Sequence, residues 1–310
     1  MRVFTFTVVG GTRKCNAHCP FCVSKQTGFC ELSKCSMLNT QNLKKAALFA
    51  LKGEASTVLF SGKGELTLYP EHITEGLQLL EPYGFSFFDL QTNGLEIGWD
   101  AAGDRRRAKH INEEVLSRWK ALGLDVIALS TVGIDPVLNA KVYHRDYPDL
   151  AQTIAYARSF GYTVRLCIMM QRGGVDSIEK LKETIAFCRE HGAEQLTIRP
   201  IRKPRDKSCD DEASKYVDEF GLEDEAVEAI SSWVRETGEL LPIEFAHDAH
   251  AYDIGGQNVC VSDCLTRGEV GVIRTLIFYR TGRTTYSWDQ EGAVLLSGWP
   301  DGMERSELMF

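Results

Sequence analysis

Residues 15–22 read Cys-Asn-Ala-His-Cys-Pro-Phe-Cys and follow an apolar, β-like run at residues 3–9. Cys15, Cys19 and Cys22 therefore have the spacing CxxxCxxC, with an aromatic residue just before the third cysteine. A cubane of four irons and four sulfurs takes four ligands, so three cysteines on one loop leave one iron open to a small molecule. Ferredoxin sequences commonly supply the fourth cysteine nearby, and this loop does not. The stretch predicts a catalytic iron–sulfur site at the end of a first strand.

The ten cysteines of the 310-residue chain also allow disulfides, a zinc site or buried thiols. The N-terminus has one Arg and an apolar stretch interrupted by threonines, without a small-residue cleavage site, so we expect no signal peptide and no disulfides. A structural zinc ion takes four ligands, commonly from two pairs. His18 is the available fourth ligand, but it lies between two of the cysteines, where wrapping one tetrahedral ion is awkward. We therefore expect a cytoplasmic, oxygen-sensitive iron–sulfur protein.

Composition excludes other classes of protein. Hydrophobic residues make up 44% and charged residues 25% of the chain, as in ordinary globular proteins. We find no apolar stretch long enough to cross a bilayer. The net charge of -8 argues against a nucleic-acid binder, which needs a basic face. The basic stretch at residues 105–107 is expected to be a solvated loop, whereas the one at residues 199–205 follows a predicted strand.

Strand and helix patterns alternate along the chain. Short apolar or β-branched runs predict strands at residues 2–9, 56–61, 85–92, 125–131, 162–170 and 194–200. Helical patterns lie between them at residues 40–52, 70–82, 111–122, 148–160 and 176–191. The C-terminal part predicts an acidic helix at 222–238, a strand at 241–246, a loop at 247–268 and a β-hairpin at 272–279 and 284–288. Alternating strands and helices imply βαβ units and a parallel sheet.

Six βα units are too few for a closed eight-stranded barrel. We predict an α/β fold, a partial (β/α)6 TIM-like barrel over residues 1–205. Residues 206–310 are expected to form a C-terminal cap of helix, substrate-side loop and β-hairpin. In such sheets the ligand site lies at the C-terminal ends of the strands, which is where the cysteine loop falls.

The cysteine motif, with its aromatic residue, resembles the signature of the radical S-adenosylmethionine superfamily. Residues 60–66, Phe-Ser-Gly-Lys-Gly-Glu-Leu, are similar to the Gly-Gly-Glu stretch with which members bind the amino group of the methionine moiety. Here Lys63 interrupts the glycine pair, and leucine stands where proline is common. The resemblance implies that Gly62, Gly64 and Glu65 bind the cofactor, while a simple strand-to-helix turn is the alternative.

Polar residues follow the later strands as well. Asn93 matches the family's strand-three ending, and Ser130 matches a position that contacts the ribose or carboxylate in many members. Arg145 is a candidate for pairing with the methionine carboxylate through a bidentate fork; a plain surface arginine is the alternative. Arg199 lies at the end of the sixth strand and is a candidate for the cofactor carboxylate or a substrate anion.

The resemblance covers about residues 1–205 and implies a [4Fe-4S] cluster and S-adenosylmethionine as cofactors. Reductive cleavage of the cofactor then gives a 5′-deoxyadenosyl radical, which abstracts hydrogen from a small polar substrate, for example a nucleoside-like one. The expected electron donor is a flavodoxin- or ferredoxin-type reductant. The alternatives are a peptide-modifying maturase, an activase for a glycyl-radical enzyme and a non-catalytic iron–sulfur electron carrier.

The C-terminal part contains two further candidate features. Cys260 and Cys264 form a CxxxC pair that is a candidate for an auxiliary cluster, completed by Cys30, Cys35 or Cys209. The candidate substrate residues are His247, Asp253 and Asn258, since polar groups at this density suit a polar substrate. A solvated loop is the alternative.

Overall fold

The computed structural model describes residues 2–26, 38–203, 211–242, 249–262, 271–288, 290 and 292–299. One mixed sheet of twelve strands organises this part of the chain. In spatial order its strands are β12 (Val294–Leu296), β11 (Thr284–Thr285), β10 (Val272–Tyr279), β1 (Arg2–Gly10), β2 (Thr57–Gly62), β3 (Phe87–Thr92), β4 (Leu124–Thr131), β5 (Thr163–Met170), β6 (Gln195–Pro200), β9 (Gln257–Val261), β8 (His250–Ile254) and β7 (Glu239–Leu240).

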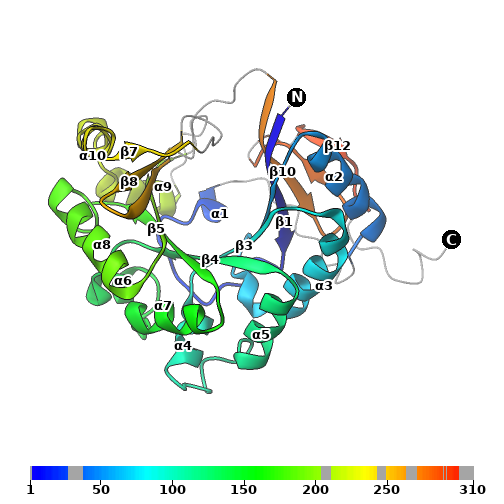
Figure 1. The fold of residues 1–310 in the computed structure, drawn as a ribbon, viewed down its shortest axis with the longest axis horizontal. Helices are drawn as coiled ribbons and strands as arrows, with labels where there is room; N and C mark the ends of the chain where they lie inside the picture. The colour runs from blue at the N-terminus through cyan, green and yellow to red at the C-terminus, as the bar shows by residue number, and fades with distance from the viewer. Residues whose placement is uncertain are drawn as a thin grey trace.

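The described helices lie mostly around the outside of this curved sheet, and α1 lies on its inner side (Figure 1). They are α1 (Val23–Gln26), α2 (Thr40–Lys52), α3 (Pro70–Leu80), α4 (Leu95–Ala101), α5 (Glu113–Ala121), α6 (Pro136–Val142), α7 (Leu150–Ser159), α8 (Ile178–His191), α9 (Glu212–Phe220) and α10 (Asp224–Thr237), with 3-10 turns at Leu66–Leu68 and Glu81–Tyr83. Helices α2, α3, α5, α7 and α8 contact the outer face of β1 to β6. None of the described helices combines the length and the hydropathy needed to cross a membrane.

The six predicted βα units are confirmed. Strands β1 to β6 pair in parallel and in chain order, and each begins and ends within two residues of its predicted range. The five predicted helices between them correspond to α2, α3, α5, α7 and α8. Short helices α4 and α6 were not predicted, because seven residues hold too few turns to reveal a helical period.

The C-terminal part joins the sheet at both edges. Strand β10 pairs in parallel with β1, and β9 pairs in parallel with β6, so eight parallel strands run from β10 to β9. The barrel remains open, because among the described strands β9 and β10 are not paired with each other. The sheet is therefore continuous across the boundary expected at residues 205 and 206.

Two C-terminal predictions need correction. The predicted loop at 247–268 contains the antiparallel hairpin of β8 and β9, closed by a turn at Gly255 and Gly256 with φ of 56° and 89°. The strand predicted at 241–246 is displaced to β7, and residues 243–248 lie outside the described part. The hairpin predicted at 272–288 is confirmed as β10 and β11, although it extends the sheet beside β1.

The main core lies between the sheet and its outer helices. Side chains that alternate along the strands, such as Leu166 and Ile168 on β5, share this core with Leu181 and Ile185 of α8. Residues at the intervening positions therefore point to the opposite, inner face of the sheet, which we call the lumen face.

Candidate cofactor site

The cysteine loop follows β1 at the C-terminal edge of the sheet. A satellite core beneath it contains Ala17, Trp99 and Tyr143, with Cys19 and Phe21 packed against its rim. The Phe21 ring meets Tyr143 edge-on at a centroid distance of 6.4 Å. The backbone N–H of His18 donates to Tyr143 O at 2.8 Å. The aromatic residue that precedes the third cysteine thus anchors the loop to the end of α6.

The three thiols interact electrostatically. The pKa of Cys15 is raised to about 11, chiefly by desolvation and also by the charges of Glu65 and Cys22. Burial likewise raises the pKa of Cys19 well above its ordinary value, again helped by the other two thiols. Iron binds thiolates, and the charge of a bound metal stabilises them. Three mutually close thiols on one loop therefore fit a cluster that supplies this charge.

A cubane and a single ion place different demands on such a loop. No group of three or more His, Cys, Asp or Glu side chains in the described part of the chain converges closely enough to hold one metal ion. A four-iron cubane does not require that convergence, because each cysteine binds a different iron atom. The thiols are also unequally exposed, with Cys15 exposed and both Cys19 and Cys22 partly buried.

The loop after β2 touches the backbone of the cysteine loop. The Glu65 N–H donates to Lys14 O at 3.0 Å. A Cβ on Gly64 would lie 2.1 Å from that same oxygen and 2.7 Å from Thr12 O. Only glycine allows this approach, so the second glycine of the stretch is required to seat the cysteine loop.

Glu65 is buried and ties the ends of two strands together. Its Oε1 accepts hydrogen bonds from the Thr67 N–H, the Thr67 hydroxyl and the Thr92 hydroxyl, at 3.0, 2.7 and 2.7 Å. Its Oε2 accepts from the Asn93 N–H at 2.9 Å. A carboxylate offers about four lone-pair sites, so capacity for another donor remains mainly at Oε2.

Asn93 links the end of β3 to the cysteine loop. Its side-chain amide donates to Asn16 Oδ1 at 2.8 Å and to Cys15 Sγ at 3.8 Å. Its Oδ1 accepts from the Leu95 N–H at 3.0 Å, at the start of α4. The structure therefore brings Gly64, Glu65 and Asn93 to the cysteine loop, while Gly62 is in register with Gly10 at the end of β1.

Ser130 and Arg199 lie on the lumen face. Ser130 is on β4, in register with Cys167 of β5, and Arg199 is on β6, in register with Met169. Both are partly buried. Ser130 lies beside the end of β3, because Leu129 is in register with Thr92, whereas Arg199 lies two strands further along the sheet.

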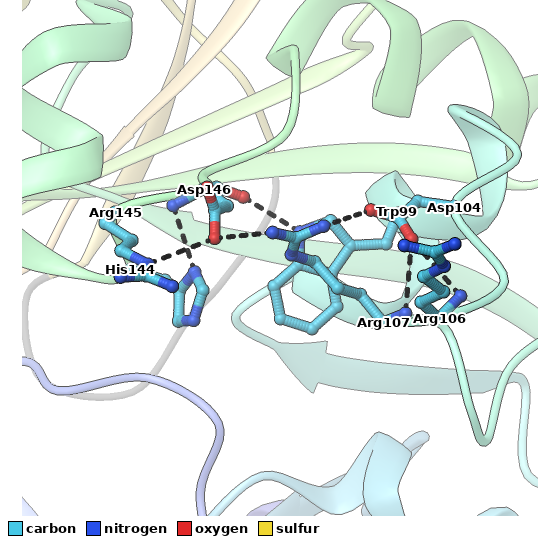
Figure 2. Close-up of polar contacts among 7 residues, drawn as sticks. All are labelled: Trp99, Asp104, Arg106, Arg107, His144, Arg145 and Asp146. Atoms are coloured by element: carbon cyan, nitrogen blue, oxygen red, sulfur yellow. Dashed lines mark hydrogen bonds and ion pairs between the residues drawn. The ribbon is translucent and has the colours of Figure 1, made fainter.

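Arg145 lies elsewhere. Its side chain is 88% exposed and its Nε lies 3.4 Å from Asp146 Oδ2. Arg107 Nη2 donates to the same Asp146 oxygen at 2.8 Å, and Trp99 Nε1 donates to Asp146 O at 2.8 Å (Figure 2). Arg145 belongs to this surface network. Its position fits a surface arginine, which is the alternative to a cofactor-binding residue.

The C-terminal candidates are not brought to the cysteine loop. Asp253 and Asn258 face each other across the β8–β9 hairpin, and Asn258 is in register with Gln195, where β6 begins. This places both at the N-terminal edge of the sheet, opposite the cysteine loop. Asp253 Oδ1 accepts from the Gly256 N–H at 2.7 Å, which stabilises the turn. His247 lies outside the described residues, as do Cys30, Cys35, Cys209 and Cys264.

Two residues that the sequence did not single out hold the start of the cysteine loop. His72 of α3 accepts a hydrogen bond at Nδ1 from the Gly11 N–H, at 2.9 Å. Tyr69 stacks on His72 and its hydroxyl lies 2.7 Å from Thr12 Oγ1. No short motif marks them, since they lie some sixty residues from the loop. The C-terminal part also reaches this edge, where Lys63 lies 5.2 Å from the Trp288 ring.

Comparison with known proteins agrees with this geometry. The family model of the Radical SAM superfamily matches residues 9–197, more than half of the chain. No curated protein matches the sequence. Among solved structures, Streptococcus suis SuiB bound to S-adenosylmethionine has a TM-score of 0.56 at 14% identity over 94% of this chain and 61% of SuiB. SuiB bound to its precursor peptide SuiA gives 0.53 at 15% identity, over 92% of this chain and 60% of that one.

HydG, a maturase of the [FeFe]-hydrogenase, has a TM-score of 0.51 at 13% identity over 76% of this chain and 51% of HydG. At these identities the likeness shows the fold alone, and the chain spans only about 60% of the length of SuiB. The family match covers the cysteine loop and the whole of strands β2 to β5. The chain has a partial TIM-barrel fold and belongs to the Radical SAM superfamily, a family that uses a [4Fe-4S] cluster and S-adenosylmethionine.

Proposed function

We propose that Cys15, Cys19 and Cys22 hold the cluster and that the enzyme abstracts hydrogen from a small polar substrate bound at the lumen face. The supporting observation is that loops from three strands meet at one edge. Glu65 donates its N–H to Lys14 O at 3.0 Å, and Asn93 donates to Cys15 Sγ at 3.8 Å. When bound, the cluster and S-adenosylmethionine supply a 5′-deoxyadenosyl radical.

The residues of this chain then have distinct tasks. Gly62 and Gly64 let the backbone approach the methionine end closely. Glu65 orders that loop, and its Oε2 is available to an ammonium group. Ser130 offers a hydroxyl from the lumen face. In this proposal the barrel wall would keep the reacting centre away from water, which a primary carbon radical requires.

The electron donor that we propose is a flavodoxin- or ferredoxin-type protein. It would deliver the single electron that reduces the cluster.

The test uses anaerobically reconstituted protein with dithionite as reductant. We expect the wild-type protein to bind iron and to form 5′-deoxyadenosine from S-adenosylmethionine, slowly even without substrate. The triple variant with Ala at Cys15, Cys19 and Cys22 should lose the cluster's visible absorption and this activity. Cys188→Ala is the matched control, because Cys188 is buried against the α8 core away from the loop. Unchanged iron content in the triple variant contradicts the proposal, and absent cofactor cleavage in the wild-type protein favours an electron carrier.

A peptide substrate is the second candidate. It is supported by SuiB, whose structure with a precursor peptide shares the fold over 92% of this chain. The two candidates differ in what stimulates 5′-deoxyadenosine formation. Small polar molecules stimulate it in the first case, and peptides do so in the second.

A further inference from the structure

The lumen face of β5, β6 and β9 carries three rows of side chains, defined by strand register. Each row contains one residue from each strand, and successive rows lie two residues apart. From the N-terminal edge toward the cysteine loop, the rows are Arg165, Gln195 and Asn258; Cys167, Thr197 and Cys260; and Met169, Arg199 and Ser262. Two arginines thus face a space that also contains two thiols.

The first arginine is fully paired. Arg165 Nη1 lies 2.5 Å from Asp89 Oδ2 on β3, and its Nε donates to Gln195 Oε1 at 2.7 Å. The Asp89 side chain is 5% exposed, so this ion pair lies deep in the barrel. Its two charges cancel, and it leaves the lumen neutral at this level.

Unlike Arg165, Arg199 has no carboxylate partner among the described residues. Its Nε is buried without a hydrogen-bond partner among the described residues, and no ion pair joins its guanidinium to any side chain in that part of the chain. Its nearest electrostatic neighbours include the thiols of Cys167 and Cys260. Burial raises the pKa of both thiols, and Arg199 opposes that effect. Protonated thiols do not balance a guanidinium charge.

Two other basic residues of the same stretch, Arg202 and Lys203, are paired with carboxylates of helices. Arg202 Nη2 lies 2.7 Å from Asp224 Oδ1 of α10, and Lys203 pairs with Asp218 of α9. Among the described residues of this stretch, Arg199 is therefore the cation without a carboxylate partner.

A partly buried guanidinium is costly unless an anion pairs with it, and its planar fork matches carboxylate and phosphate groups. We propose that Arg199 forms an anion subsite in the lumen, where it binds a carboxylate or phosphate group of the substrate. This inference rests on the proposed function, because it assigns the lumen to a small-molecule substrate. It narrows the substrate class to small anionic molecules.

The cofactor carboxylate is the other possible anion. The contact between Asn93 and Cys15 places the cysteine loop beside the end of β3. Strand β6 lies three strands further along the sheet, roughly 14 Å away at the usual strand spacing. Arg199 is thus better placed for the substrate than for a methionine group held near Cys15.

Cys260 provides a chemical probe, because it is partly exposed and lies in the row next to Arg199. We would alkylate reconstituted full-length protein with anionic iodoacetate or neutral iodoacetamide and follow Cys260 by peptide mass spectrometry. The measured quantity is the rate with iodoacetate divided by the rate with iodoacetamide. Both reagents react with the thiolate, so differences in thiol ionisation cancel in this ratio. We expect Arg199→Gln to lower this ratio about fivefold, since a cleft charge concentrates anions. Inorganic phosphate should lower it in the wild-type protein as well.

Two variants serve as controls. Arg199→Lys keeps the charge and should retain most of the ratio, which also guards against misfolding of the Gln variant. Arg202→Gln removes a nearby arginine that is paired with a carboxylate of α10 and should leave the ratio unchanged. Equal ratios in the wild-type protein and Arg199→Gln overturn the proposal.

Equilibrium dialysis with radiolabelled S-adenosylmethionine distinguishes the two anions. We expect Arg199→Gln to change cofactor affinity by less than about twofold, since the pairing serves the substrate. A loss of tenfold or more assigns Arg199 to the cofactor carboxylate and overturns the proposal. Failure of the proposed function has a different readout, which is wild-type protein that neither binds iron nor cleaves the cofactor. The alkylation ratio depends on neither property, so the two failures can be distinguished.

Discussion

The side-chain amide of Asn93 donates to Cys15 Sγ at 3.8 Å, which joins the end of β3 to the cysteine loop. The same side chain donates to Asn16 Oδ1, and its own Oδ1 accepts from the Leu95 N–H at the start of α4. Asn93→Ala removes all three contacts. We expect the free energy of unfolding to fall by about 1 kcal/mol, as for a lost cap, and iron content after reconstitution to fall as well.

Asn112→Ala provides the matched control for this variant. Asn112 Oδ1 caps α5 by accepting from the Val115 N–H at 2.9 Å, far along the chain from the cysteines. It should lose similar stability in chemical denaturation while retaining its iron. Equal iron content in the two variants would contradict the role assigned to Asn93.

A second prediction concerns Gly64. A Cβ at this position would lie 2.1 Å from Lys14 O, so Gly64→Ala must push the cysteine loop away from the sheet edge. We expect the variant to fold, because the strain is confined to two loops, and to bind less iron. Gly292→Ala is the control, since a Cβ there meets no atom of the described structure within 4 Å. Iron analysis and visible absorption measure the outcome, and wild-type iron content in Gly64→Ala would refute the prediction.

The positions of residues that follow a strand directly along the chain were predictable. Cys15, Gly64 and Asn93 each follow a strand directly, and parallel strands bring their ends to one edge. The six strand and helix units were predictable for the same reason, because each spans enough residues to reveal its period.

Positions that depend on the path of a loop, or on strands far apart in the chain, were not predictable. Arg145 carries the right chemistry, but its pairing with Asp146 on the surface is decided by the path of the loop after α6. The pairing of β9 with β6 and of β10 with β1 requires strands that come from the far end of the chain. Their short, mixed patterns look like loop or hairpin sequence, and only the uncovered edges of the sheet give them a parallel partner.

A third prediction uses pH. His72 accepts the Gly11 N–H at Nδ1, which requires the neutral ring. Burial, and to a lesser degree the Arg280 charge, lowers the pKa of His72 from 6.5 to about 4. Between pH 6.5 and about 4 the unfolded chain therefore binds a proton at His72 more readily than the folded protein does. The contribution of neutral His72 to the free energy of unfolding is full above pH 6.5 and is lost as the pH falls toward 4.

His72→Gln tests this prediction, because the glutamine amide oxygen can accept the same N–H without titrating. Urea denaturation at several pH values between about 4 and 7 should show a shallower decline in the free energy of unfolding than in the wild-type protein. His250→Gln, at an exposed histidine, should keep the wild-type slope. Parallel slopes in His72→Gln and the wild-type protein would exclude His72 as the source.

The last prediction separates a buried ion pair from a surface one. Asp89→Asn leaves the Arg165 guanidinium without its charge partner inside the barrel, and we expect a loss of about 3 kcal/mol in the free energy of unfolding. Asp104→Asn removes a carboxylate from Arg107 at the surface, where Asp146 remains as a partner and solvent screens the charge, so its effect should be small (Figure 2). Chemical denaturation measures both. If the two variants lost similar free energy of unfolding, solvent would screen the Asp89–Arg165 pair to the same degree as a surface pair. The lumen would then be more hydrated than its buried side chains indicate.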